Sequence, residues 1–428
     1  PPEEPPTRAV GAGALGLLGL LTLINVLNFV DRQLLPSFAN FIKPDLHLTD
    51  TQYGLLTGLF FLIFYAVAGL FMGILADLTH RPRLIAIAIG LWSLVTAASG
   101  AARGFLSMAL PRALVGIGES ALTPTAMSLL SDRFPPARLG LATGVYYMGV
   151  PIGSGVSLLV AGYLGPAIGW RNCFYLLGCA GLTLAAVMLF VRDPRHAQRT
   201  PAMGRGPGIG LQIRQLTAAL GRSPALVATM TGGVALHIAV GAASFDQLWF
   251  VQERGYDRAQ IAQITGYLTF AGGIAGNLFG GFIGDWWQRS TKSGRPMLLF
   301  WMMLCLTPLS VAYRLAPSGS PLFYAGILIG IFQLAAFYGP TFSTVQELAP
   351  NAARATVTAF YILCLNVIGL GIGITGAGWT TDLYRAAGVA QPYTFSLVTF
   401  TLVSTIAIPA FFLAGRWFKR DRERIAVA

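Results

Sequence analysis

Long apolar runs dominate this chain of 428 residues and limit what it can fold into. A helix needs roughly 20 mostly apolar residues to cross the ~30 Å hydrocarbon core of a bilayer. Twelve such runs lie near 12–37, 51–76, 84–103, 106–131, 139–165, 172–191, 224–250, 260–284, 296–316, 321–346, 355–381 and 393–417. Only 11% of the residues are charged, whereas soluble domains carry about 25%. The sequence therefore predicts an all-α membrane protein with twelve transmembrane helices.

One loop is longer than the others and divides the twelve spans into two sets of six. Residues 192–223 are rich in basic residues, glycine and proline, and they contain one weakly amphipathic stretch around Ile213, Leu216 and Leu220. Such a stretch is typical of a helix that lies on a membrane surface. We predict an N-terminal six-helix bundle over 1–191, a cytoplasmic linker over 192–223 and a C-terminal six-helix bundle over 224–428.

Basic residues alternate between rich and poor loops. If both termini are cytoplasmic, the cytoplasmic segments carry 20 Lys and Arg residues and the outside loops carry seven. Positive charge accumulates on the cytoplasmic side of membrane proteins, so both termini are predicted to be cytoplasmic. The net charge of +12 is thus a topology signal. A nucleic-acid-binding protein would instead gather its charge on one soluble face.

A pattern of one glycine and two charged residues at the end of a span recurs between the two halves. The first set is Gly73, Asp77 and Arg81, and the second set, 208 positions later, is Gly281, Asp285 and Arg289. A second pair of loops carries Asp132 and Arg138 in the first half and Glu347 and Arg354 in the second. These recurrences predict two homologous halves, a plan typical of transporters whose site lies between the halves.

Charged residues inside the first and fourth predicted spans stand out, because lipid makes a charge costly there. Asp31 and Arg32 lie in the first span, and Arg112 and Glu119 lie in the fourth. Arg112 and Glu119 are seven residues apart, so they share one helix face about 10 Å apart along the axis. Such residues mark a substrate or proton pathway, or they form a static ion pair that holds the first and fourth spans together. Both interpretations stay open.

Other polar residues inside spans are weaker candidates for the site. His237 lies in the seventh span and could titrate near neutral pH, although a buried histidine is often only a hydrogen-bonded part of the core. Tyr146 and Tyr147 in the fifth span, with an aromatic run in the second, could line an apolar cavity or pack against neighbours.

Cysteines and histidines are too dispersed to form a reactive or metal site. The four cysteines stand singly, with no CxxC pair, and the four histidines are equally scattered. Two GxGxxG matches, at 11–16 and 371–376, lie inside apolar runs and do not follow a strand, as a dinucleotide site would require. We therefore expect no enzymatic activity, no cofactor and no bound metal, and the absence of a Walker lysine motif argues against direct use of ATP.

The loop over 73–83, with the sequence GILADLTHRPR, resembles the hallmark loop of the major facilitator superfamily. The resemblance implies the major facilitator fold and a secondary transporter. It also implies that Asp77 and Arg81 bridge helices on the cytoplasmic side and hold the outward-facing state, with Asp285 and Arg289 as the second-half copies.

A narrower resemblance is carried by three strings and by the Trp170-Arg171 step. The strings are 28–32, which begins at Asn28, 112–121 and 146–155. Together they resemble the Spinster family, whose members move sphingosine-1-phosphate and lysophospholipids. Anion:cation symporters for organic acids carry a similar Asp-Arg pair and a similar Arg-to-Glu run, so the substrate stays open between these two classes.

These observations lead us to predict a secondary active transporter that moves an anionic amphiphile by alternating access. A proton gradient would drive it, with protonation of Glu119 linked to whether Arg112 pairs with Glu119 or with Asp31. The alternatives are a symporter of small carboxylates and an uncoupled lipid facilitator. The excess of 26 Arg over three Lys and the short loops favour a bacterial inner membrane, and we expect a monomer.

Overall fold

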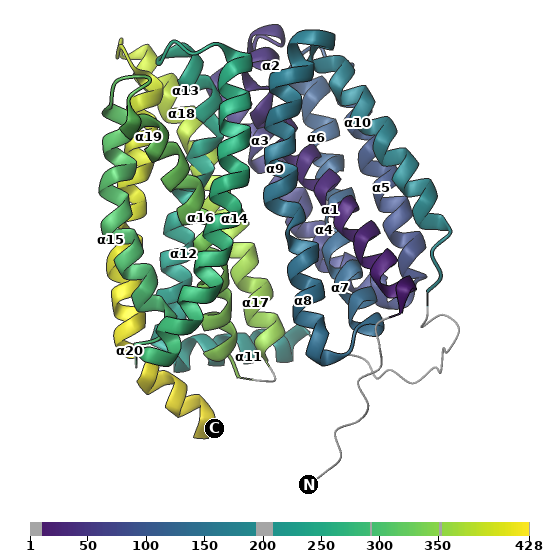
Figure 1. Cartoon of the computed structure of the whole chain (residues 1–428), viewed down its shortest axis with the longest axis vertical. Helices are drawn as coiled ribbons and strands as arrows, with labels where there is room; N and C mark the ends of the chain where they lie inside the picture. The colour runs from purple at the N-terminus through teal and green to yellow at the C-terminus, as the bar shows by residue number, and fades with distance from the viewer. Residues whose placement is uncertain (1–10, 194–208, 292, 351–352, 428) are drawn as a thin grey trace. The chain divides into compact units, whose positions relative to one another are not determined.

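The computed structural model describes residues 11–193, 209–291, 293–350 and 353–427, and every element in these ranges is a helix (Figure 1). The elements up to residue 189 are α1 (Ala12–Ser37), α2 (Ala39–Asp45), α3 (Asp50–Thr57), α4 (Leu59–Leu78), α5 (Arg81–Ser99), α6 (Phe105–Glu119), α7 (Leu122–Arg133), α8 (Pro136–Tyr147), α9 (Gly149–Leu159), the π-helix η1 (Val160–Leu164) and α10 (Gly165–Leu189). The all-helical prediction is confirmed.

The remaining elements continue the same pattern. They are α11 (Ile209–Arg222), α12 (Pro224–Ala242), η3 (Ala243–Phe245), α13 (Asp246–Gln252), α14 (Arg258–Ser290), α15 (Gly294–Leu315), α16 (Pro321–Glu347), α17 (Arg354–Leu363), the π-helix η5 (Cys364–Leu370), α18 (Gly371–Ala386), α19 (Pro392–Val403), η6 (Ser404–Ile406) and α20 (Ala407–Val427). Each of the twelve predicted spans corresponds to one helix or to consecutive helices.

Ten segments of the described chain are long and apolar enough to cross a membrane. One of them, Arg138–Leu189, has 52 residues, which at 1.5 Å per residue is about 78 Å and more than twice the hydrocarbon thickness. The chain leaves helical geometry inside this segment at Gly169, where φ is 81° and ψ is 154°. The segment therefore accounts for both the fifth and the sixth predicted spans. The eighth predicted span, α14, has 33 residues but is less apolar because of its many glycines.

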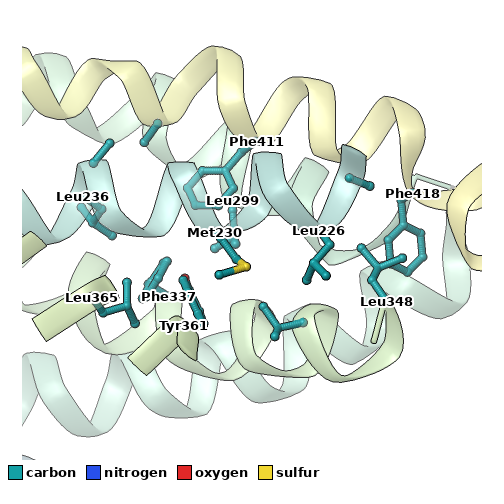
Figure 2. Packing of buried hydrophobic residues seen from close by; sticks show 14 of the residues in the cluster. Leu226, Met230, Leu236, Leu299, Phe337, Leu348, Tyr361, Leu365, Phe411 and Phe418 are labelled. Carbon is teal, nitrogen blue, oxygen red and sulfur yellow. The ribbon is translucent and has the colours of Figure 1, made fainter. Parts of the chain in front are cut away.

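The chain forms two compact units, one made of residues 1–47 and 60–201 and the other of residues 48–59 and 202–428. In the first unit, α1 packs on α9, and α5 packs on both α10 and α6. In the second unit, α14 packs on α16, and α12 and α15 pack on α20. Figure 2 shows part of the second core, in which Met230, Phe337, Tyr361 and Phe411 meet among other buried apolar residues.

This division differs from the sequence boundaries in one segment, α3. Helix α3 is the start of the second predicted span, yet it packs on α18 in the second unit. Asp382 of α18 accepts hydrogen bonds from the backbone N–H groups of Asp50 (3.2 Å) and Thr51 (2.8 Å). Gly54 removes a side chain where an alanine Cβ would lie 2.9 Å from the Ile374 carbonyl oxygen. The helix ends at Gly58, whose φ of −104° and ψ of −99° are not helical.

The amphipathic stretch of the predicted linker forms helix α11. Leu216 and Leu220 are partly buried against the core of the second unit, and Ala219 is buried there. Ile213 is 56% exposed. One face of α11 therefore contacts protein, and its predicted place on a membrane surface stays a prediction.

Candidate substrate site

Four charged residues on α1 and α6 come together inside the first unit. Asp31, Arg112 and Glu119 are 1%, 4% and 2% exposed, and the side chain of Arg32 is 21% exposed. A buried charge is tolerated only when it is paired or hydrogen-bonded. The arrangement of these four residues therefore decides what the first unit can bind.

Two glycines bring neighbouring helices close to Glu119. A Cβ on Gly116 would lie 2.6 Å from the Phe61 carbonyl oxygen of α4, and a Cβ on Gly118 would lie 3.0 Å from Cβ of Trp92 on α5. Distances under 3.0 Å are sterically forbidden and those up to 3.4 Å are tight. The Gly-Ile-Gly-Glu string of α6 thus lets α4 and α5 approach the backbone on either side of the carboxylate.

Arg32 is held by one carboxylate and three aromatic rings. Its Nε donates to Oε2 of Glu119 at 3.3 Å. Its guanidinium carbon lies 5.3 Å from the ring centroid of Phe29, 4.7 Å from that of Phe61 and 4.6 Å from that of Tyr65. Cation–π contacts of this kind are strongest where water is excluded. The guanidinium is therefore kept charged and in place at an apolar position.

Arg112 shares one of these rings. Its guanidinium carbon lies 5.3 Å from the centroid of Phe61, and Arg112 is an electrostatic neighbour of both Asp31 and Glu119. The sequence predicted that Arg112 pairs with Glu119 or with Asp31, and this alternation stays a prediction. The structure adds Arg32 as a partner of Glu119, which it reaches from α1.

Several polar atoms in this cluster are buried and have no hydrogen-bond partner within the described ranges. They are both carboxylate oxygens of Asp31, Oε1 of Glu119, Nδ2 of Asn28 and Nε1 of Trp92. Such a group costs about 1–3 kcal/mol when it stays unsatisfied, and two of them lie near a carboxylate, Asn28 near Glu119 and Trp92 near Asp31. The cluster therefore combines one ion pair with buried polar atoms that can make a further hydrogen bond.

Trp92 is a member of this cluster that sequence reasoning missed. It is fully buried on α5, and its indole N–H faces the Asp31 carboxylate. A single tryptophan in an apolar run is usually part of the core or of the interfacial belt. Nothing in the sequence near Trp92 signals a contact with Asp31, because the contact joins α5 to α1, two helices that are remote in the chain.

Tyr146, a candidate from the sequence, lies at the contact between α8 and α1. Its carbonyl oxygen accepts a hydrogen bond from Nδ2 of Asn25 at 2.9 Å, and its hydroxyl lies 3.3 Å from Oγ1 of Thr123. Its side chain is fully buried, whereas that of Tyr147 is 45% exposed. Tyr146 therefore packs in the first unit, and its place in a substrate site stays a prediction.

His237, the candidate on α12, belongs to the core of the second unit. Its Nδ1 lies 2.9 Å from the Gly233 carbonyl oxygen, and its Nε2 lies 3.2 Å from the hydroxyl of Tyr338. Its ring also contacts Phe337, with 5.3 Å between the centroids. Both ring nitrogens have partners, as in a structural histidine, and a role in coupling stays a prediction.

A second group of charges lies at the ends of α5, α7 and α10. Arg81, at the start of α5, donates from NH1 to Oδ2 of Asp132 at 2.7 Å and to Ser128. Its backbone N–H and Nε donate to Asp193 at 3.0 Å and 3.2 Å. Asp77 belongs to the last turn of α4, and its side chain lies outside the described residues. The bridge therefore joins three helix ends in the first unit, and Asp193 is a partner that the sequence did not indicate.

The corresponding bridge of the second unit is made by Arg295. It donates to Asp285 and to Glu347, each at 2.8 Å. Arg289, the expected copy of Arg81, instead donates to the backbone oxygen of Asp285 at 3.2 Å. The constant offset of 208 pointed to Arg289, but Arg295 follows Arg81 by 214 positions and starts the equivalent helix. Glu347 follows Asp132 by 215 positions. The offset between the two halves therefore changes from 208 at the end of the second span to 214 and 215 at the third and fourth spans.

The remaining two gating candidates lie at the ends of α8 and α17. Arg138 is exposed. Arg354 donates from Nε to the Gln346 carbonyl oxygen at 3.0 Å. Gating roles for these residues stay predictions.

Comparison with known proteins decides the family. Residues 21–374 match the sequence model of the Major Facilitator Superfamily. The chain belongs to this superfamily. Superfamily proteins are membrane transporters and not enzymes, so the chain is a multi-pass membrane transporter.

Other superfamily proteins resemble the chain over most of its length. An MFS-type efflux pump of Mycolicibacterium smegmatis is 29% identical over 406 residues, covering 92% of this chain and 91% of the relative. A hexuronate transporter of Bacillus subtilis is 26% identical, covering 82% and 84%. The crystal structure of a bacterial homologue of the human lysosomal transporter Spinster superposes with a TM-score of 0.82 at 24% identity, covering 96% of this chain and 99% of that chain. The predicted superfamily is confirmed, and the likeness to Spinster extends over nearly the whole fold.

Proposed function

We propose that this transporter moves an anionic amphiphile across the membrane by alternating access, and that protons drive the movement. The observation that carries the proposal is the pair of guanidinium groups at one aromatic ring. Arg32 and Arg112 lie 4.7 Å and 5.3 Å from the Phe61 centroid, inside a unit that spans the membrane. The residues proposed to bind substrate or a proton are Asn28, Asp31, Arg32, Arg112, Glu119, Tyr146 and, with a smaller part, His237.

The chemistry of the head group follows from the arginines. A guanidinium presents a planar fork of donors that matches a phosphate or a carboxylate, and it stays charged at every physiological pH. Two of them near one ring can bind one anion together once a proton neutralises a neighbouring carboxylate of the cluster. The rings of Phe29, Phe61 and Tyr65 around Arg32 offer apolar surface for the first part of an acyl chain.

The coupling follows from the shared use of Arg32. In the structure Arg32 donates to Glu119, so an incoming anion competes with the Glu119 carboxylate for the same guanidinium. A proton on Glu119 removes that competition and releases Arg32 for the substrate. Anion binding is therefore favoured when Glu119 is protonated, and this is a thermodynamic link between proton and substrate.

Replacing Glu119 by glutamine tests the coupling. Glu119→Gln imitates the protonated residue, so the purified variant should bind the anion at least as well as the wild type, and its binding should not depend on pH. In liposomes it should no longer accumulate substrate against a gradient when a pH difference is imposed. The unfolding temperature in detergent serves as the control for folding. Proton-driven accumulation at the wild-type level by a well-folded variant would exclude Glu119 as the coupling residue.

A small organic acid is the second candidate substrate, and the similarity to a hexuronate transporter favours it. Both candidates need the arginines, but only the amphiphile needs an acyl chain. Binding of lysophospholipids with increasing tail length, and of hexuronate as the small anion, separates the two. Affinity that rises with tail length supports the amphiphile, since each buried CH₂ contributes about 0.8 kcal/mol. Affinity independent of tail length, with competition by hexuronate, would establish the small-anion transporter.

The cytoplasmic orientation of both termini, the bacterial inner membrane as location and a monomeric state are part of the same proposal. The positive charges of alternate loops support the orientation. We also propose that Arg81 and Arg295 act as the gating bridges of the two units, together with Asp77, Asp132, Asp285 and Glu347.

A further inference from the structure

A small cavity lies in the first unit at the start of α1, beside the ends of α7 and α10. Its volume is about 320 Å³. It is lined by Gly13, Gly16, Leu17 and Leu20 of α1, by Arg133 of α7 and by Phe190, Val191 and Arg192 after α10. A volume near 300 Å³ is at the lower end of small-molecule sites, so the cavity can hold a head group but not a whole lipid.

The two arginines of the cavity are neighbours in sequence of the acids that bind Arg81. Asp132 and Asp193 both pair with Arg81, so their charges are already used. Arg133 follows Asp132, and Arg192 precedes Asp193. Each of these two dipeptides therefore presents its acid to the bridge and its base to the cavity.

Arg133 contacts the segment that carries Arg192 and keeps one donor available. NH2 of Arg133 donates to the Arg192 carbonyl oxygen at 3.2 Å. Nε of Arg133 is buried and has no hydrogen-bond partner among the residues that the structure describes. Arg192 is exposed. A buried guanidinium N–H without an acceptor points to an anion as the missing partner.

The opposite wall of the cavity is apolar and open. An added Cβ on Gly13 or Gly16 would have no described atom within 4 Å, and Leu17 and Leu20 form the wall beside them. Phe190 is 87% exposed. Aromatic rings at the ends of membrane spans are typical of the membrane interface, and the cavity thus joins apolar surface to a positive end, as an anionic lipid does.

We propose that this cavity binds the phosphate of an anionic phospholipid, with Arg133 and Arg192 as its ligands. The lipid belongs to the surrounding membrane and is distinct from the transported substrate. Because Arg133 and Arg192 are adjacent to Asp132 and Asp193, the bound lipid holds the ends of α7 and α10 in the positions that Arg81 requires. Anionic lipid would thereby stabilise the Arg81 bridge.

The test measures binding of phosphatidylglycerol to the purified full chain in a zwitterionic detergent, by native mass spectrometry and by the unfolding temperature. The double variant Arg133→Gln/Arg192→Gln removes both ligands. The double variant Arg422→Gln/Arg424→Gln is the matched control, since these two residues are exposed near the C-terminus. We expect the first pair to weaken phosphatidylglycerol binding by at least about tenfold and the control pair to bind as the wild type does. Equal affinity in both double variants would overturn the proposal.

A second variant protects the test against misfolding. Gly16→Leu fills the cavity without removing a charge, and leucine is a better helix former than glycine. It should also lose phosphatidylglycerol binding while its unfolding temperature without lipid stays at or above the wild-type value. Unchanged lipid binding by Gly16→Leu would refute the cavity as the site.

Two further arms separate the lipid from other ligands. Inorganic phosphate at the same concentration should not raise the unfolding temperature, and protection equal to that by phosphatidylglycerol would refute a lipid site in favour of a free-anion site. Arg32→Gln, which changes the proposed substrate site, should leave phosphatidylglycerol affinity as in the wild type. Loss of affinity in Arg32→Gln would place the lipid in the substrate site instead.

Discussion

Replacing Gly116 by alanine should displace α4 and disturb the arginine pair without touching any charge. The added Cβ would lie 2.6 Å from the Phe61 carbonyl oxygen and 3.1 Å from the Tyr65 nitrogen, whereas ordinary contact begins at 3.4 Å. At this contact α4 and α6 must therefore move apart by about 0.8 Å. The backbone of α4 carries the rings of Phe61 and Tyr65, which contact Arg32, so the guanidinium loses part of its support.

The substitution has two opposing effects on the free energy of unfolding, but only an unfavourable effect on anion binding. Overpacking costs about 1–3 kcal/mol, and alanine regains about 1 kcal/mol of helix propensity over glycine, which leaves a loss of about 0–2 kcal/mol in the free energy of unfolding. A desolvated cation–π contact is worth about 2 kcal/mol. Weakening one or two such contacts at Arg32 should reduce anion affinity by roughly 10- to 30-fold.

The assay compares anion binding and unfolding temperature for Gly116→Ala and Gly90→Ala. Gly90 lies on α5 in the same unit, and an added Cβ there meets no described atom within 4 Å. It therefore provides the same chemical change without the displacement. We expect Gly90→Ala to bind as the wild type does. If Gly116→Ala binds equally well, the rings of α4 do not support the substrate site and the reasoning is wrong.

Three ion pairs give further predictions. Arg295→Gln should lower the unfolding temperature and impair transport, whereas Arg289→Gln should change neither. The reason is that, within the described chain, Arg295 contacts the carboxylates of both Asp285 and Glu347. Equal effects of the two variants would contradict the assignment of the bridge. Asp50→Asn should speed amide hydrogen exchange in α3, since its carboxylate accepts from partners on α18 and α19, and unchanged exchange would show that packing alone holds α3. The hydrogen bond from Arg171 lowers the pKa of Asp45. The ionised Asp45 therefore stabilises the folded protein above its ordinary pKa of about 4, and this stabilisation is lost as the pH falls through the lowered pKa. Asp45→Asn should remove this pH-dependent part of the free energy of unfolding, which is below about 1 kcal/mol because the ion pair is largely exposed. Identical acid unfolding curves for the variant and the wild type would exclude a contribution of the pair.

The sequence was sufficient for the elements because their cause is local. A membrane span is specified by about 20 consecutive apolar residues, so each predicted run corresponds to one helix or to consecutive helices. Helix α1 and the predicted first span share the same bounds. The candidate cluster could be found for a similar reason, since a charge inside an apolar run is visible without any knowledge of neighbours. Asp31, Arg112 and Glu119 were identified in this way, and all three are buried in the first unit.

Tertiary structure alone decided which of these residues pair and where helix segments belong. Glu119 pairs with Arg32, because the fold brings α1 beside the end of α6, which no spacing along one helix can show. Trp92 joins the cluster because Gly118 lets α5 approach α6. In the second unit, Arg295 takes the place expected for Arg289, and α3 packs on α18. The sequence shows which side chains each helix has. Their pairing depends on the distances between helices that are remote in the chain, and these distances are set by the small residues and the side-chain shapes at the helix contacts.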